Sequence, residues 1–586
     1  MTRRAKNILF VMCDQLRFDH LSCYGHPKLH TPNLDALAAR GVIFDRAYVQ
    51  SPVCGPSRMS YYTGRYMHSH GVSWNFVPLK AGEMTIGDHL RPLGVKSVLV
   101  GKTHMRADHA GMARMGIDPK SPIGVRIAEC GFDPYERDDG LHPFSGHDPD
   151  PHYNQYLRDH GFGGDNPWES WANTVTDHDG TLRSGWFLKY SNLPARVPAE
   201  HSETAYTTTR AMDFMKQAKA RDAAQPWLVH LSYIKPHWPY VVPEPYASMY
   251  SVEDALPLVR SDDELRDAHP VYAAMTRHRV ARTFAQPGVR DAVMVGYMGL
   301  VKQIDDELGR LFAFMRDEDL LDNTMIVFCA DHGDFLGDHW LGDKEMFHEP
   351  VVRTPLIVVD PDPRADATRG TRSSALVEAV DLAPTFLDVH EGQPLPHIFD
   401  GRSLRPLLFG QAPERWREIA VCECDYAFQD SRIELGTPSR EAWMRMAFDG
   451  RWKYVLTEGY RPMLFDLETD PQELRDLGAS TQAEHADVRA RLHEALFRWA
   501  RQPRQRVTIP DDVIEATEIQ ARVAEAGILI GYADEADLAA QRQRFKPRFA
   551  STNPLVKITL DKLTGRVPID ASAHEPQTTH EGTTAR

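Results

Sequence analysis

The sequence predicts an α/β fold in which helices cover both faces of a mainly parallel sheet. Short, continuous apolar runs alternate along the chain with longer stretches that repeat their apolar residues at helical spacing. Strands of a parallel sheet are buried on both faces and therefore read as unbroken apolar runs. The predicted strands lie at 7–12, 95–100, 227–233, 324–329 and 356–359, and the predicted helices at 203–218, 292–314 and 381–389.

Polar residues follow the first predicted strand, and a capping sequence precedes the first predicted helix. The strand at 7–12 ends in Asp14 and Gln15. Thr31 is the expected N-cap of a helix whose first position is Pro32, because proline has no N–H to leave unpaired there. The region 105–200 is rich in Gly, Pro, Asp and His with little periodicity, and so long an irregular region is typical of a functional segment.

Three parts follow from the changes in pattern along the chain. Residues 1–410 form the larger α/β domain, and residues 411–500 a small domain with an antiparallel sheet. The small domain is predicted from short alternating runs and one helix, at 420–424, 443–448, 452–456 and 487–499. Residues 501–586 form an extended C-terminal tail whose polar end is predicted to be disordered.

Composition excludes several classes of protein. With 586 residues, 42% of them hydrophobic, the chain can bury a large core. The formal net charge of −15 argues against a general nucleic-acid binder. The seven scattered cysteines form no CxxC pair, which argues against a disulfide framework and a structural zinc. The apolar runs are too short for a membrane span or a signal peptide, so we expect a cytoplasmic protein with no membrane partner.

Acidic residues end two of the predicted strands. Asp14 follows the first strand, and Asp331 with His332 follows the strand at 324–329. Open α/β sheets place their ligands at the carboxyl ends of strands, so these acids can share a metal ion if their strands lie close together. Alternatively, each Asp is an ordinary turn residue. Asp, Gln and His ligands suit Mn²⁺, Ca²⁺ or Mg²⁺ better than a thiolate-preferring metal.

The stretch Ser51-Pro-Val-Cys54-Gly55-Pro56-Ser57-Arg58, with Thr63-Gly64-Arg65 close behind, resembles the signature of the formylglycine-dependent sulfatases of the alkaline phosphatase superfamily. The resemblance covers residues 5–480 and implies an alkaline-phosphatase-like fold. Further matching motifs occur in the same order: Thr31-Pro-Asn-Leu-Asp35, Gly101-Lys102-x-His104, Lys235-Pro-His237, Asp331-His332-Gly333, Leu336-Gly337-Asp338-His339, Lys344, Arg353-x-Pro355 and Leu464-Phe-Asp-Leu-x-x-Asp-Pro471.

The resemblance implies that a formylglycine-generating maturation enzyme oxidises Cys54 to an aldehyde. A hydrated aldehyde has two geminal oxygens, one of which binds the metal, loses its proton and becomes a nucleophile at neutral pH. The other then collapses back to the aldehyde and expels the bound oxyanion. The alternative is an unmodified buried thiol. Arg58 is implied to hold the diol or the metal-bound oxygens, since its planar fork donates several hydrogen bonds.

The same resemblance implies one divalent metal ion and its ligands. Gln15 stands where a second Asp is usual, and His332 where Asn is often found. Neutral ligands leave more positive charge at the site, which can shift the preference from Ca²⁺ toward Mn²⁺. The combination looks like choline sulfatases and also like phosphonate monoester hydrolases and phosphodiesterases, so metal and substrate stay open. The implied ligands are Asp14, Gln15, Cys54, Asp331 and His332.

Four positions are implied to surround the transferred group: Lys102, His104, His237 and Lys344. Cations and imidazoles there stabilise charge on the nonbridging oxygens and on the leaving oxygen. His237 or His104 can protonate the departing alkoxide, and Asn75 is a further donor to the substrate. Phosphonate monoester hydrolases tend to have Tyr-x-Thr in place of Lys102-x-His104, so this pair favours sulfate esters.

The predicted function is metal-dependent hydrolysis of small anionic sulfate esters, arylsulfatase-like and promiscuous toward phosphorus esters. The alternative with the same nucleophile is a phosphonate monoester hydrolase or phosphodiesterase, and a different class is a catalytically silent binding module. Trp168, Trp171 and Trp186 either form a wall for a substrate headgroup or pack a long loop, the latter being favoured. Isolated apolar positions in the tail predict a homodimer or homotetramer: 528–530, 545, 549 and 555–560.

Overall fold

The computed structural model describes residues 5–143, 145–146, 150–411, 413–414, 416–502 and 533–544. It divides into two compact units. The first unit comprises 1–394 with 399–502 and holds both larger sheets, so the expected boundary near residue 410 stays a prediction. The second comprises 395–398 with 503–586, where the described helix is α19 (Glu535–Arg544). The tail positions from which an oligomer is predicted lie outside the described residues.

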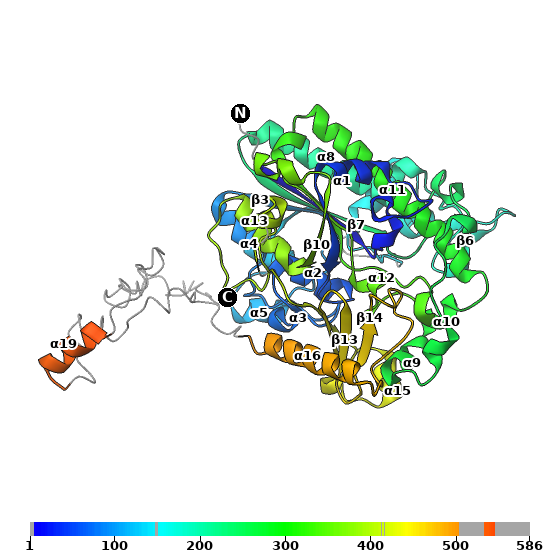
Figure 1. The fold of residues 1–586 in the computed structure, drawn as a ribbon. Helices are drawn as coiled ribbons and strands as arrows, with labels where there is room; N and C mark the ends of the chain where they lie inside the picture. Colours follow the sequence, from blue (N-terminus) through cyan, green and yellow to red (C-terminus); the bar gives the residue numbers. More distant parts are fainter. Residues whose placement is uncertain are drawn as a thin grey trace, which may run out of the picture. The chain divides into compact units, whose positions relative to one another are not determined.

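A mixed sheet of eight strands forms the centre of the first unit (Figure 1). Its neighbouring strands are parallel except for β9, which runs antiparallel to both β2 and β8. The predicted mainly parallel sheet is therefore confirmed. In spatial order the strands are β10 (Thr371–Glu378), β2 (Val42–Tyr48), β9 (Leu356–Val359), β8 (Thr324–Ala330), β1 (Asn7–Asp14), β7 (Trp227–Pro236), β3 (Lys96–Gly101) and β4 (Asp133–Arg137).

Helices cover both faces of this sheet, as the unbroken apolar strands require. Every residue of β1 is buried, and successive side chains point to opposite faces. Leu9 and Val11 join the core formed with α1 (Pro32–Arg40), α8 (Glu203–Asp222) and α11 (Val289–Asp317). On the other face, Phe10 contacts Tyr61 of α2 (Cys54–Thr63) and Phe386 of α13 (Leu382–Val389). Figure 1 shows these two groups of helices on opposite sides of the sheet.

The remaining described helices lie mostly in the connections between strands and, except for α16, are short. Within the described ranges, none is long and apolar enough to cross a membrane. They are α3 (Met67–His70), α4 (Ile86–Leu90), α5 (His109–Arg114), α6 (Pro122–Ala128), α7 (His152–Asp159), α9 (Pro270–Thr276), α10 (Arg279–Phe284), α12 (Glu349–Val352), α14 (Arg405–Leu408), α15 (Asp430–Leu435) and α16 (Ala483–Ala500).

Helix α1 begins where the sequence predicts, but its cap comes from elsewhere. Pro32 is the first helical residue, and the Thr31 side chain makes no capping bond. It instead accepts a hydrogen bond from the Ser22 N–H at 3.1 Å. The carboxylate of Asp305, on α11, accepts the N–H groups of Asn33 at 3.1 Å and Leu34 at 2.9 Å. A side chain distant in sequence thus satisfies the N–H groups that begin the helix.

A second sheet of four antiparallel strands follows, as predicted. Its apolar face packs on α16 through Leu492, Leu496 and Trp499. The strands are β11 (Ala420–Asp425), β12 (Trp443–Phe448), β13 (Trp452–Thr457) and β14 (Met463–Asp466).

A buried ion cluster joins this second sheet to the segment before β9. The Lys453 ammonium, on β13, is fully buried. It lies 2.9 Å from a carboxylate oxygen of Glu349 and 2.7 Å from one of Glu473, and it donates to the Phe347 carbonyl at 2.8 Å. The other Glu473 oxygen accepts the Glu349 N–H at 2.7 Å. The three charges are therefore held by one another and by the backbone.

The region 105–200 contains more regular structure than its composition indicates, including the hairpin of β5 (Thr174–Thr176) and β6 (Leu182–Ser184). Its tryptophans pack against other residues of the region, the alternative that the sequence favoured. Trp168 is 2% exposed and donates to a Glu203 carboxylate oxygen at 2.7 Å. Trp186 donates to Glu169 at 2.9 Å, and the Arg196 guanidinium lies 4.0 Å from the Trp171 ring centroid.

Candidate active site

Four neighbouring strands bring several of the predicted site residues to one edge of the large sheet. The strands β8, β1, β7 and β3 are consecutive in the sheet and mutually parallel. The register pairs Cys13 of β1 with Ala330 of β8, so Asp14 and Asp331 follow side by side. The condition that their strands be close is therefore met. His237 follows β7 and Lys102 follows β3 at the same carboxyl edge, where open α/β sheets bind ligands.

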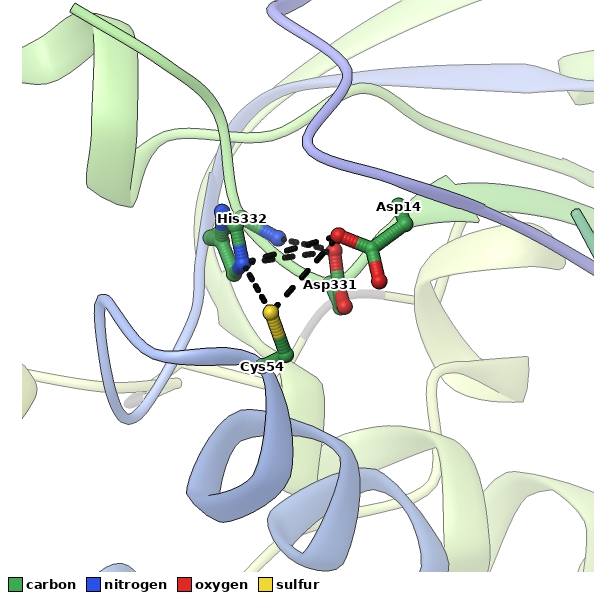
Figure 2. Close-up of side chains that lie close together, drawn as sticks. All are labelled: Asp14, Cys54, Asp331 and His332. Carbon is green, nitrogen blue, oxygen red and sulfur yellow. Dashed lines mark hydrogen bonds and ion pairs between the residues drawn. The ribbon is translucent and has the colours of Figure 1, made fainter. Parts of the chain in front are cut away.

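Asp14, Cys54, Asp331 and His332 converge at this edge, as Figure 2 shows. All four are buried, and their potential ligand atoms lie within 4.8 Å of one another. Cys54 Sγ is 3.0 Å from His332 Nε2 and 3.7 Å from Asp14 Oδ1. His332 Nε2 is 3.8 Å from an oxygen of each carboxylate. Two carboxylates and an imidazole around a common point fit a hard divalent cation such as Ca²⁺ or Mn²⁺.

Cys54 occupies the first position of α2, after the extended Val53. The helix N-terminus favours negative charge on the side chain at that position. Ser57, one turn on, donates to the Asp331 carbonyl at 2.5 Å and ties the helix to the end of β8. Gly55 permits a close approach, because a Cβ there would lie 2.9 Å from Asn75 Oδ1. Asn75 Oδ1 accepts the Gly55 N–H at 2.8 Å.

Arg58 is buried next to the cluster and binds both of its carboxylates. Its Nε donates to Asp331 at 2.7 Å and its Nη2 to Asp14 at 3.2 Å. Its Nη1 donates to the Lys102 carbonyl at 2.9 Å and to Ser232 Oγ at 2.8 Å. The expectation from the sequence, that Arg58 holds the diol or the metal-bound oxygens, stays a prediction. In the structure the guanidinium fixes the two carboxylates, as groups behind metal ligands do.

The tautomer of His332 follows from its backbone contact. Its Nδ1 lies 2.8 Å from the Gly333 carbonyl and must donate to it, which leaves Nε2 facing Cys54 and the carboxylates. Burial lowers the pKa of His332, but Asp331 and then Cys54 outweigh that effect and raise it to about 9. Burial likewise opposes ionisation of Asp14, yet Lys102, His237 and Arg58 hold its pKa well below the usual range. The carboxylates thus favour positive charge beside them.

Gln15 is oriented by acidic residues that sequence reasoning missed. Its Nε2 donates to Asp334 at 2.6 Å and to Asp343 at 3.0 Å. Tyr240, whose hydroxyl lies 3.2 Å from Nε2, itself donates to Asp334 at 2.6 Å. Because ionised carboxylates only accept, the amide oxygen must face the other way, where it accepts from Lys344 Nζ at 3.1 Å. Gln15 therefore presents an oxygen, the atom that a metal ligand requires.

Two lysines supply positive charge to the cluster. Lys102 Nζ lies 2.6 Å from Asp14 Oδ2, and Lys344 Nζ lies 3.2 Å from Cys54 Sγ. Both side chains are buried. Burial lowers the pKa of Lys344, but Asp343, Cys54 and Asp14 raise it well above the usual value, so the ammonium stays protonated. These are the cations expected around a transferred anionic group.

The two predicted imidazoles are neutral. Burial is the first cause that lowers the pKa of both His237 and His104 well below 6.5, and Lys102 adds to it. His237 Nδ1 donates to the Trp238 carbonyl at 2.8 Å, so its Nε2 carries a lone pair. His104 has a positive φ of 55°, and its backbone N–H donates to a carboxylate oxygen of Asp139 at 2.9 Å. No sequence motif predicted this contact. In this state His237 can accept a proton, so the predicted donation to the departing alkoxide requires that the imidazole first take one up.

Comparison with known proteins gives consistent matches. The family model described as Sulfatase matches residues 6–392, and the model described as N-sulphoglucosamine sulphohydrolase, C-terminal, matches residues 337–502. A multifunctional alkaline phosphatase superfamily protein, PehA, from Trinickia caryophylli is 29% identical over 85% of this chain and 95% of its own. An arylsulfatase from Clostridium perfringens is 27% identical over 80% of this chain and 90% of its own. The solved phosphonate monoester hydrolase from Silicibacter pomeroyi superposes with a TM-score of 0.74 at 30% identity, over 86% of this chain and 97% of its own.

Proposed function

Because this chain belongs to the sulfatase family, within the alkaline phosphatase superfamily, we propose that it hydrolyses sulfate esters with a divalent metal ion and a formylglycine made from Cys54. The observation that carries the proposal is the buried convergence of Cys54 with Asp14, Asp331 and His332. A thiol at that point has no need of two carboxylates and an imidazole, whereas a hydrated aldehyde bound to a cation does.

The residues at the site fit the proposed groups. Asp14, Asp331 and His332 would hold the cation together with Gln15 and an oxygen on residue 54. A divalent cation there, Ca²⁺ or Mn²⁺, supplies Lewis acidity that ionises a hydroxyl at neutral pH. Arg58 keeps the two carboxylates in place from below. Burial of the whole cluster excludes bulk water and strengthens each charge–charge contact.

The substrate anion is bound by the surrounding cations. Lys102 and Lys344 would contact the nonbridging oxygens, where charge grows in the transition state. His237 presents a lone pair at Nε2, so we propose that it takes up the proton released at residue 54 and later returns it to the leaving oxygen. The side-chain oxygen of Asn75 accepts the Gly55 N–H, so we propose that its amide N–H groups donate to the substrate.

A phosphonate monoester hydrolase or phosphodiesterase is the second candidate. Its support is the solved phosphonate monoester hydrolase with a TM-score of 0.74, together with the Asp-Gln and Asp-His pairs of this chain. Lys102 and His104 favour sulfate esters instead, as argued from the sequence. The nucleophile, the cation and the positioning groups are the same for both reactions, so only the relative rates on the two ester classes separate them.

Mass spectrometry of the peptide that contains Cys54 tests the nucleophile. The expected result is loss of the thiol and gain of an aldehyde when the protein is made together with a formylglycine-generating enzyme. The peptide containing the buried Cys329 is an internal control and keeps its thiol. A Cys54 that stays a thiol in active protein contradicts the proposal.

Kinetics on matched esters test the substrate. An aryl sulfate, a phosphodiester and a phosphonate monoester with the same phenol leaving group should give the highest kcat/KM for the sulfate. Metal removed by chelation should abolish turnover, and Mn²⁺ or Ca²⁺ should restore it. If the two phosphorus esters are turned over far faster, the second candidate is correct.

A further inference from the structure

Three aromatic side chains form a cluster next to the proposed active site. The rings of Trp74 and Phe428 stack with centroids 5.7 Å apart and an interplanar angle of 23°. Phe76 meets Phe428 edge-on at 6.2 Å. Phe76 is 61% exposed and Phe428 is 52% exposed, whereas Trp74 is buried beneath them. We call Trp74, Phe76 and Phe428 the aromatic rim.

One side of the rim is attached to the residue after the nucleophile. Asn75, between the two rim residues Trp74 and Phe76, accepts the Gly55 N–H at 2.8 Å. The Asn75 Cα would lie only 3.2 Å from a Cβ placed on Gly55. Because consecutive Cα atoms are about 3.8 Å apart, the Cα of Phe76 lies within about 12 Å of the Cα of Cys54. That distance is within reach of a bicyclic leaving group and a phenylalanine side chain together.

The other side of the rim is attached to the residue after a site lysine. Gln429, adjacent to Phe428, donates to a Glu345 carboxylate oxygen at 2.7 Å. Cys424, on β11, donates to the Glu345 carbonyl at 3.5 Å. Glu345 follows Lys344, whose Nζ is 3.2 Å from Cys54 Sγ. Two segments far apart in sequence, each attached to a residue next to the site, therefore bring exposed aromatic rings together near the same nucleophile.

We propose that the aromatic rim is the leaving-group subsite and that it selects esters of flat, apolar leaving groups such as bicyclic phenols. The reaction part of this inference rests on the proposed function, whereas the binding part does not. Large exposed apolar side chains that lie together mark binding surfaces. Phenylalanine and tryptophan rings bind other aromatic rings by offset or edge-to-face contact. Because the rim is continuous with the site through Asn75 and Glu345, its occupant is the bound substrate rather than a second copy of the chain.

Binding of non-hydrolysable sulfonates tests the subsite without any turnover. The probes are 2-naphthalenesulfonate and methanesulfonate, measured by calorimetry on the full chain. Phe76→Ala and Phe428→Ala should each weaken naphthalenesulfonate binding about tenfold, which corresponds to about 1.4 kcal/mol. Methanesulfonate binding should be unchanged. Ile433→Ala is the matched control, because Ile433 is 66% exposed on α15 and is not part of the rim; it should change neither.

Turnover of two esters tests selectivity. The ratio of kcat/KM for 2-naphthyl over methyl sulfate should fall about tenfold in each rim variant and stay unchanged in Ile433→Ala. Equal losses on both probes, or no loss on either, would overturn the subsite. A rim variant that changes only the association state in light scattering would show a subunit contact and also overturn it. If the rim variants bind naphthalenesulfonate more weakly as expected but no sulfate ester is hydrolysed, the proposed function is wrong and the subsite is retained.

Discussion

Replacing Lys453 by Met removes the ammonium that two carboxylates share in the buried ion cluster, which joins the second sheet to the segment before β9. In the native protein the ammonium lies 2.9 Å from Glu349 and 2.7 Å from Glu473, and it also donates to the Phe347 carbonyl. Methionine has a similar volume, so the packing changes little. The variant nevertheless leaves two carboxylates facing each other in the interior without the ammonium between them, and Glu349 keeps only the more distant Arg353 guanidinium, 3.6 Å from its other oxygen.

The expected cost follows from the burial of the cluster. Breaking a buried ion pair by removing one partner typically costs 3–5 kcal/mol, because an uncompensated charge stays in a low-dielectric site. We therefore expect Lys453→Met to lower the free energy of unfolding by about 3–5 kcal/mol. Combining it with Glu349→Gln and Glu473→Gln removes both carboxylate charges and should recover most of that loss. Arg440→Met, at an exposed ion pair with Glu441, is the control and should cost less than about 1 kcal/mol.

Urea unfolding at pH 7, with hydrogen exchange of the β13 amides as a local readout, measures the effect. Glu349 and Glu473 raise the pKa of Lys453 despite its burial. The stabilisation from the ammonium is therefore fully present below about pH 10.4 and is lost as the pH rises through the folded pKa. Lys453→Met should lack this alkaline loss. A cost below about 1 kcal/mol, or no recovery in the triple variant, would refute the reasoning.

Three further predictions concern the site. Arg58→Lys replaces a guanidinium that binds two carboxylates by a single point charge. Affinity for the metal, measured by chelator competition, should therefore fall about 10- to 100-fold. An unchanged affinity would show that the guanidinium is dispensable. Lys102→Met should lower kcat by about 10²–10³-fold at unchanged metal content, since it removes a cation that stabilises developing charge, and a kcat within twofold of wild type would exclude that role. Gln15→Glu places a third carboxylate against Asp334 and Asp343 and deletes their shared donor. It should cost about 2 kcal/mol or more in thermal unfolding, and an unshifted midpoint would contradict the orientation assigned to Gln15.

Strand prediction succeeded where burial is complete on both faces. The sequence of β1 is almost continuously apolar because every one of its residues is buried, and the same holds for β7 and β8. The sheet-edge strand β10 begins Thr-Arg-Ser, and β2 contains Asp45-Arg46 between apolar ends. Their mixed patterns do not distinguish a strand from a loop, so neither was predicted.

The site was predictable to the extent that its residues belong to short motifs. Cys54, Asp14 and Asp331 each stand at a recognisable position in the chain, and the order of the strands brings them together. The residues that orient these side chains belong to no such motif. Asp334 lies 319 positions from Gln15 and Asp305 lies 271 positions from Leu34, and no local pattern connects such partners. Hydrogen bonds of this range depend on the assembled tertiary structure.

Asp14 and Asp331 stand at the ends of two central strands, and Cys54 begins a fully buried helix, and this attachment separates two kinds of change that the protein can undergo. Side chains attached to the hydrogen-bonded centre of the large sheet move only if the sheet itself moves. The aromatic rim, by contrast, is borne by two connecting segments at the surface. New segments there would redirect the enzyme to another alcohol or phenol while its ester-cleaving chemistry is inherited intact. Grafting those two segments between relatives is therefore the most direct route to retargeting it.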